Sequence, residues 1–190
     1  KIGKHVKSPA SATREWCLYM KNKMDFSNIV CVNANPEVSR RLGKLFKHDI
    51  RLWDTDWTYI NGIPTVPPEK VVNRALKLVE RKIRIIVWFI QPHFPAPLND
   101  PPLPVFRAVP HDKTINYILD PKKEIEKGRL TREMIIQGYE SNIRWVLDEV
   151  FKRLLPKLKD KKVVITSDHG EMLGEYGYYG HWDGAESVSY

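Results

Sequence analysis

Short, continuous apolar runs alternate along the chain with segments in which apolar residues recur every three or four positions. A continuous run predicts a strand that is buried on both faces, whereas the longer spacing predicts a helix with one apolar side. The strands predicted in this way are Ile29–Val32, Ile50–Trp53, Arg84–Ile90 and Lys162–Thr166. The predicted helices cover Thr13–Lys23 and Thr131–Leu155, and two more begin at Pro36 and at Pro67–Pro68.

This alternation is typical of an α/β fold, and it predicts a three-layer α/β/α sandwich with a mainly parallel sheet. The 190 residues are expected to form a single domain, residues 1–190. From Gln91 to about Pro121 the sequence is rich in proline and has no periodicity, which predicts an irregular functional loop or lid. The chain begins with Lys1, and Ser187–Tyr190 resembles the start of a strand, so we expect a sandwich truncated at one or both ends.

Ligands of parallel sheets bind beyond the carboxyl ends of the strands, which directs attention to the residues that follow each run. Asp168 and His169 come just after Lys162–Thr166, with Gly170 next to them. A carboxylate and an imidazole are a normal mixed pair of ligands for Zn, Mn or Fe, and the glycine allows a sharp turn. In isolation the same residues could be a helix N-cap beside a surface histidine. Their position after a strand favours a metal or phosphate site.

Two further histidines are candidates. His93 follows the strand Arg84–Ile90 and lies between Pro92 and Pro95, which fix the backbone around it. This arrangement favours a functional imidazole, and the alternative is a rigid loop in which the histidine is incidental. His181 lies in a loop rich in glycine and tyrosine, where it is equally a further metal ligand or a histidine packed on tyrosines.

The composition narrows the range of partners. Lys and Arg exceed Asp and Glu by 31 to 23, a net charge of +8, which suits nucleic acid, an anionic membrane face or an anionic substrate. The basic residues are spread along the chain without a nucleic-acid-binding motif, so no nucleic acid is expected. No apolar run approaches the ~20 residues of a transmembrane helix. Cys17 and Cys31 lie in apolar segments without a secretion signal, which predicts buried free thiols and a cytoplasmic protein.

The residues that follow the predicted strands resemble a known family. Thr166–Glu175, after its apolar run, is similar to the C-terminal metal motif of the sulfatase branch of the alkaline phosphatase superfamily. Gln91–His93 resembles the strand-then-Pro-His segment of sulfatases and lipoteichoic acid synthases, and the helix with Tyr139 resembles the one between these motifs. The three landmarks occur in order over residues 82–182. Val32–Pro36 is also similar to uncharacterised archaeal members.

This resemblance implies an α/β/α sandwich and a metal-dependent hydrolase or transferase that acts on phosphate or sulfate esters. It implies that Asp168 and His169 bind a divalent metal ion, which would be Mn, Zn or Ca. His93 would hold the phosphoryl or sulfuryl group or assist the leaving group. His181 stands where some members place another ligand, although many sulfatases have a lysine near there.

The sequence also departs from the family pattern. Members open with a strand that ends in a metal-binding Asp or Glu, followed by a Ser, Thr or formylglycine nucleophile at a helix start, and no such strand precedes residue 8. The candidate nucleophiles are Ser8 and Ser11, although a serine before proline is also an ordinary N-cap. Without Cys-x-Pro-x-Arg, a formylglycine sulfatase is not expected. Asp54 and Asp56 could add carboxylates, but their aromatic neighbours favour a loop with aromatic anchors. The alternative function is a non-catalytic relative that binds an anionic ligand or a partner protein.

Overall fold

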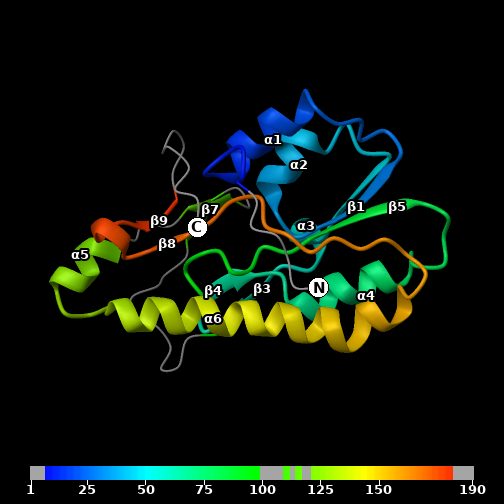
Figure 1. Ribbon diagram of the computed structural model, residues 1–190. Coiled ribbons are helices and arrows are strands. Elements are labelled where there is room, and N and C mark those ends of the chain that lie inside the picture. The colour runs from blue at the N-terminus through cyan, green and yellow to red at the C-terminus, as the bar shows by residue number, and fades with distance from the viewer. Residues whose placement is uncertain (1–6, 99–108, 112–113, 117–120, 182–190) are drawn as a thin grey trace.

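The computed structural model describes residues 7–98, 109–111, 114–116 and 121–181 (Figure 1). Its centre is a three-stranded parallel sheet in the order β2-β1-β5. Every residue of the central strand β1 is buried, as its continuous apolar run predicts. The strands of this sheet are β1 (Ile29–Asn33), β2 (His48–Arg51) and β5 (Arg84–Trp88).

Helices cover both faces of this sheet, so the architecture is the predicted α/β/α sandwich. Successive residues of β1 point to opposite faces. Ile29 and Cys31 pack with α1 and α2, whereas Val30 and Val32 pack with α4 and the helical turn that follows α6. In Figure 1, α1 and α2 lie above the sheet, and α4 and α6 lie below it. The four helices are α1 (Thr13–Lys21), α2 (Pro36–Leu42), α4 (Pro68–Leu76) and α6 (Arg132–Glu149).

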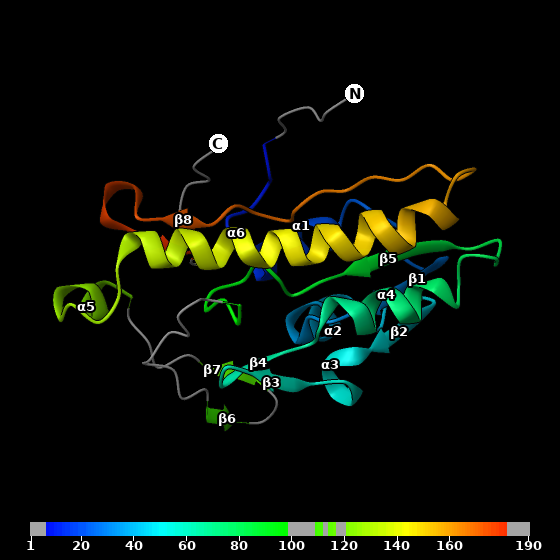
Figure 2. The same cartoon turned by 90° about the horizontal axis from the view of Figure 1, so that it is seen from below.

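Helices α2 and α6 begin at a capping side chain. The Asn35 side chain caps α2 by accepting a 2.9 Å hydrogen bond from the Glu37 amide, and Pro36 occupies the first position. Thr131 caps α6 in the same way. Helix α6 continues through the π-helical turn η1 (Val150–Leu154) and the 3-10 turn η2 (Leu155–Lys157). Figure 2 shows α6 running from α5 and β8 at one end to α4 and β5 at the other.

Two predicted strands differ from the structure. Strand β2 ends at Arg51, and the next residues form the helical turn α3 (Leu52–Thr55) in place of a strand through Trp53. The prediction of a buried strand at Lys162–Thr166 is wrong, because this segment pairs with no strand of the described chain. Val164 is 85% exposed. An apolar run becomes a buried strand only where a neighbour supplies hydrogen bonds and cover, and no described strand does so here.

The remaining elements are short. Of the predicted irregular segment from Gln91 to Pro121, residues 99–108, 112–113 and 117–120 lie outside the described part, as does Ser187–Tyr190. None of the described helices combines the length and apolarity needed to cross a membrane. Two-stranded antiparallel sheets are formed by β3 (Thr58–Ile60) with β4 (Ile63–Thr65), β6 (Val109–His111) with β7 (Thr114–Asn116), and β8 (Met172–Leu173) with β9 (Tyr179–Gly180). Two short helices complete the chain, α5 (Pro121–Glu126) and the 3-10 turn η3 (Glu175–Gly177).

Candidate metal and substrate site

Segments far apart in the sequence meet at one polar pocket. The start of α1, the loops that follow β1 and β5, the Ser167–Glu171 loop and the residue after β9 all contribute to its wall. The pocket holds about 60 Å³ of space. Its position beyond the carboxyl ends of β1 and β5 is where parallel sheets bind ligands. The polar residues that line it are Thr13, Asn35, Gln91, His93, Tyr139, Ser167, Asp168, His169, Glu171 and His181.

Three of these side chains converge on one point. The Thr13 hydroxyl donates a 2.7 Å hydrogen bond to Asp168 Oδ2, and Thr13 Oγ1 lies 3.2 Å from His169 Nε2. His169 Nε2 and Asp168 Oδ2 are 3.6 Å apart. Thr13 is the first residue of α1, so the positive end of the helix dipole lies beside the cluster. The arrangement places a hydroxyl, a carboxylate and an imidazole around one small volume.

The positions of the hydrogens in this cluster indicate which kind of ligand suits the space between the three side chains. His169 Nδ1 lies 2.8 Å from the Gly170 carbonyl oxygen, which can only accept, so Nδ1 carries the hydrogen. In the neutral ring, Nε2 therefore carries a lone pair. The single Thr13 hydroxyl hydrogen goes to Asp168, so beside a neutral His169 ring the lone pairs of Thr13 Oγ1 and His169 Nε2 would face each other without a proton between them. A cation relieves that repulsion.

The spacing of the three atoms suits a metal ion. Ligands about 2.1 Å from a tetrahedral or octahedral ion lie about 3.0–3.4 Å from one another. The three distances around Thr13, Asp168 and His169 run from 2.7 to 3.6 Å, which brackets this range. A donor set with one imidazole nitrogen beside two oxygens suits Mn or Zn better than Ca, which prefers oxygen ligands alone.

A second group of possible ligands lies on the other side of His169. His169, Glu171 and His181 each offer a ligand atom within 4.8 Å of the others. Glu171 Oε2 lies 2.6 Å from His181 Nδ1. Burial acts to raise the pKa of Glu171, but the hydrogen bond and charge of His181, helped by His93 and His169, outweigh it, and the pKa lies below its ordinary value.

His93 completes a cluster of three imidazole rings. Its ring centre is 5.1 Å from that of His181, which in turn is 4.2 Å from that of His169. Burial lowers the pKa of His93 to about 4, opposed by the nearby Glu171 and reinforced by the two other rings. His93 is therefore neutral at neutral pH. The peptide bonds before Pro92 and Pro95, on either side of it, are both cis.

The structure gathers the four predicted residues His93, Asp168, His169 and His181 at one pocket. The two serines lie differently. The Ser8 hydroxyl donates to the backbone carbonyl of Asp168, and the Ser11 hydroxyl donates to Glu15 Oε2 at 3.3 Å. The reading of Ser8 as an N-cap is wrong, because α1 begins at Thr13 and its N-cap is Ala12.

The aspartates after β2 lie outside the pocket. Asp54 is exposed in α3, and Asp56 is 3.7 Å from Lys70 Nζ. Among the pocket residues that the sequence does not single out, Thr13 and Glu171 matter most for the chemistry of the site. Thr13 opens a predicted helix within the candidate nucleophile segment, and Glu171 belongs to the motif that resembles the sulfatases. Both residues therefore lie in segments that the sequence identifies, but their contacts follow only from the tertiary structure.

The chain as a whole is similar to a known family. The sulfatase family model matches residues 27–188, which is most of the chain. The chain belongs to the sulfatase family. The match includes His93, Asp168, His169 and His181, and it begins after Thr13, so the place of Thr13 in the site rests on geometry. Comparisons with curated proteins and with solved structures give no significant match.

Proposed function

We propose that this sulfatase-family protein is a metal-dependent hydrolase or transferase of phosphate or sulfate esters, with Thr13 Oγ1 as the nucleophile. The observation that carries the proposal is the contact of this hydroxyl with both Asp168 Oδ2 and His169 Nε2 at the start of a helix. Hydroxyl nucleophiles are weak unless a base or a metal ion activates them. Here the hydroxyl lies among the atoms best suited to hold such an ion.

Asp168, His169 and the Thr13 hydroxyl would hold a Mn or Zn ion. The bound ion would lower the pKa of the hydroxyl and offset the charge of the ester oxygens. Asp168 orients the hydroxyl through its 2.7 Å hydrogen bond and is placed to take its proton. The N-terminus of α1 adds partial positive charge, which favours an anionic group at this end of the pocket.

The histidines on the other side of the pocket complete the reaction. The Thr13 oxygen forms a bond to phosphorus or sulfur while the bond to the ester oxygen breaks. The departing oxygen needs a proton, and His181, beside the Glu171 carboxylate, is the group placed to hold and deliver it, while the neutral His93 next to it can donate a hydrogen bond to the bound group. Water or an alcohol then takes the group from Thr13, which restores the hydroxyl. The first acceptor makes the protein a hydrolase and the second a transferase, in keeping with the resemblance to both sulfatases and lipoteichoic acid synthases.

Turnover and trapping together test the proposal. The protein would be incubated with Mn²⁺ and with the 4-nitrophenyl esters of phosphate and sulfate, quenched in acid and digested for mass spectrometry. We expect a phosphoryl or sulfuryl group on Thr13. The Thr13→Ala variant should lose turnover and bind the metal more weakly through Asp168 and His169, whereas the matched Ser11→Ala variant, at the same helix start, should behave as the unchanged protein.

The possible outcomes distinguish an enzyme from a non-catalytic relative of the family. Turnover that survives in Thr13→Ala would show that another group is the nucleophile. Binding of both esters without turnover by the unchanged protein would support a non-catalytic relative that binds an anionic ligand. Selective labelling of Thr13 by one ester would identify the transferred group as phosphoryl or sulfuryl.

A further inference from the structure

Glu171 and His181 are brought together by the β8–β9 hairpin. In this antiparallel pair Met172 lies opposite Gly180, and one step further in the same register places Glu171 opposite His181. Ten positions apart in the sequence, the two side chains meet with Glu171 Oε2 2.6 Å from His181 Nδ1. The hairpin thus holds one carboxylate against one imidazole at the edge of the pocket.

The hairpin is fixed to the body of the protein. Arg132 of α6 donates a 2.8 Å hydrogen bond to the Leu173 carbonyl and lies 3.5 Å from the carboxylate of Glu175. Gly174 begins the turn with a φ of 108°, a backbone conformation that residues with a side chain rarely adopt. Because its base is anchored in this way, the hairpin gives the pair a defined position relative to the pocket.

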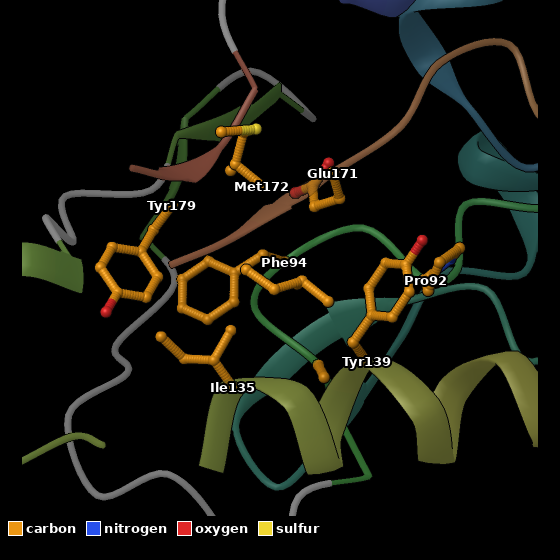
Figure 3. Close-up of a pocket in the computed structure, with 10 residues that line it drawn as sticks. Pro92, Phe94, Ile135, Tyr139, Glu171, Met172 and Tyr179 are labelled. Carbon is orange, nitrogen blue, oxygen red and sulfur yellow. The ribbon is translucent and has the colours of Figure 1, made fainter. Parts of the chain in front are cut away.

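Glu171 is buried among apolar groups. Its side chain is 6% exposed. Figure 3 shows Glu171 and Met172 on one side of a crevice, with Ile135 and Tyr139 of α6 facing them. Glu171 Oε1 is buried and has no hydrogen-bond partner in the described part of the chain, so His181 is the side chain that compensates this carboxylate. Burying a carboxylate is costly unless a partner offsets the lost hydration, so the position of Glu171 depends on its pairing with His181.

We propose that Glu171 is a positioning residue for His181. Its carboxylate accepts the Nδ1 hydrogen, fixes the ring in that tautomer and directs Nε2 into the pocket that His181 shares with His93 and His169. This inference rests on the proposed function for what Nε2 does there, since Nε2 is then the atom that takes up the proton and passes it to the departing oxygen. Glu171 itself acts through His181 and does not bind the metal ion.

The competing role for Glu171 is direct metal ligation, which its distance to His169 and His181 permits. Two substitutions separate the roles. Glu171→Gln keeps an oxygen that can accept the Nδ1 hydrogen, but an amide is a poor substitute for an ionised ligand. Glu171→Leu removes the acceptor and keeps much of the volume. The matched control is Glu140→Leu, which makes the same change at an exposed position of α6 outside the polar pocket.

The experiment has a readout that does not depend on activity. Nitrogen-15 NMR of the histidine rings, recorded on metal-free protein at mildly alkaline pH, reports which nitrogen carries the hydrogen, and the His181 signal is identified by its loss in His181→Gln. We expect the Nδ1-H form in the unchanged protein, in Glu171→Gln and in Glu140→Leu. We expect Glu171→Leu to lose this preference.

Activity and metal binding complete the test. Glu171→Leu should lower kcat by about 10- to 100-fold. Glu171→Gln, which keeps the acceptor oxygen but loses the charge, should lower kcat less, and Mn²⁺ affinity should be similar in both variants. Loss of Mn²⁺ binding in both variants would overturn the inference in favour of direct ligation. An unchanged His181 tautomer in Glu171→Leu would also overturn it, and this result leaves the role of Thr13 standing. If the ester assays fail for every variant, the NMR result still decides the role of Glu171 while the proposed function falls.

Discussion

The hydroxyl of Thr13 donates a hydrogen bond to Asp168 Oδ2 across 155 positions of the sequence. The candidate nucleophile therefore comes from the first helix, and the candidate metal ligands come from a loop near the other end of the chain. Cys17, one turn further along α1, packs with Cys31 of the central strand, so α1 is fixed to the sheet. The site is thus assembled by the packing of α1 on the sheet and not by local sequence.

Replacement of Asp168 by Asn should separate metal binding from folding. Asn keeps an oxygen for the Thr13 hydroxyl but removes the charge, so we expect divalent-metal affinity to fall by at least about tenfold. Because Asp168 lies in a loop outside the buried core, the free energy of unfolding of the metal-free protein should change by less than about 0.5 kcal/mol, which is about 2 °C in Tm.

Elemental mass spectrometry after dialysis against Mn²⁺ or Zn²⁺ gives the number of bound ions per chain, and calorimetry gives the stability. Asp160→Asn, in an exposed turn, is the matched control and should bind metal normally. A large drop in Tm of the metal-free Asp168→Asn protein would show instead that Asp168 mainly supports the fold.

The layers of the fold could be predicted from the sequence, because the first four residues of β1 are apolar and each neighbouring helix carries an apolar face. The family could also be recognised, since the metal motif is continuous in sequence. The residues of a strand do not show which strand it pairs with. For this reason the prediction of a buried strand at Lys162–Thr166 is wrong. The roles of Thr13 and Glu171 could not be predicted, because they depend on contacts with His169 and His181 that form only in the folded chain.

The low pKa of His93 predicts a loss of stability in mild acid. As the pH falls from 6.5, the ordinary pKa, towards about 4, the pKa in the folded protein, the unfolded chain gains a proton on His93 that the folded chain does not. The unfolded state then binds more protons, so the free energy of unfolding decreases as the pH falls through this window. The contribution of His93 alone is at most about 3 kcal/mol.

Urea unfolding of metal-free protein at several pH values between 4 and 8 measures this effect. His93→Gln should show a smaller decrease than the unchanged protein, and His48→Gln, on an exposed residue, should follow the unchanged protein. Equal decreases in the His93→Gln and unchanged proteins would mean that His93 is protonated with little penalty in the folded state.

The two cysteines are expected to remain unreactive thiols. Burial, with the charges of Asp168 and Glu37, raises the pKa of Cys17 to about 12 against a smaller opposing effect of Arg41. Burial also raises the pKa of Cys31 well above its usual range. Since the thiolate is the reactive form, Ellman's reagent should label neither residue in the folded protein and both in urea. Rapid labelling of one thiol under native conditions would contradict the packing of α1 against β1.

The same Val→Ala substitution at two apolar runs tests the assignment of the sheet. Val32 is fully buried in β1, so Val32→Ala should lower the free energy of unfolding by about 2 kcal/mol through lost burial and a cavity. Val164 is 85% exposed in the segment that pairs with no described strand, so Val164→Ala should change the free energy of unfolding by less than about 0.5 kcal/mol. Urea unfolding of both variants beside the unchanged protein gives the two values under identical conditions. If Val164→Ala is as destabilising as Val32→Ala, the segment is covered in solution, and the original expectation of a buried strand at Lys162–Thr166 is restored.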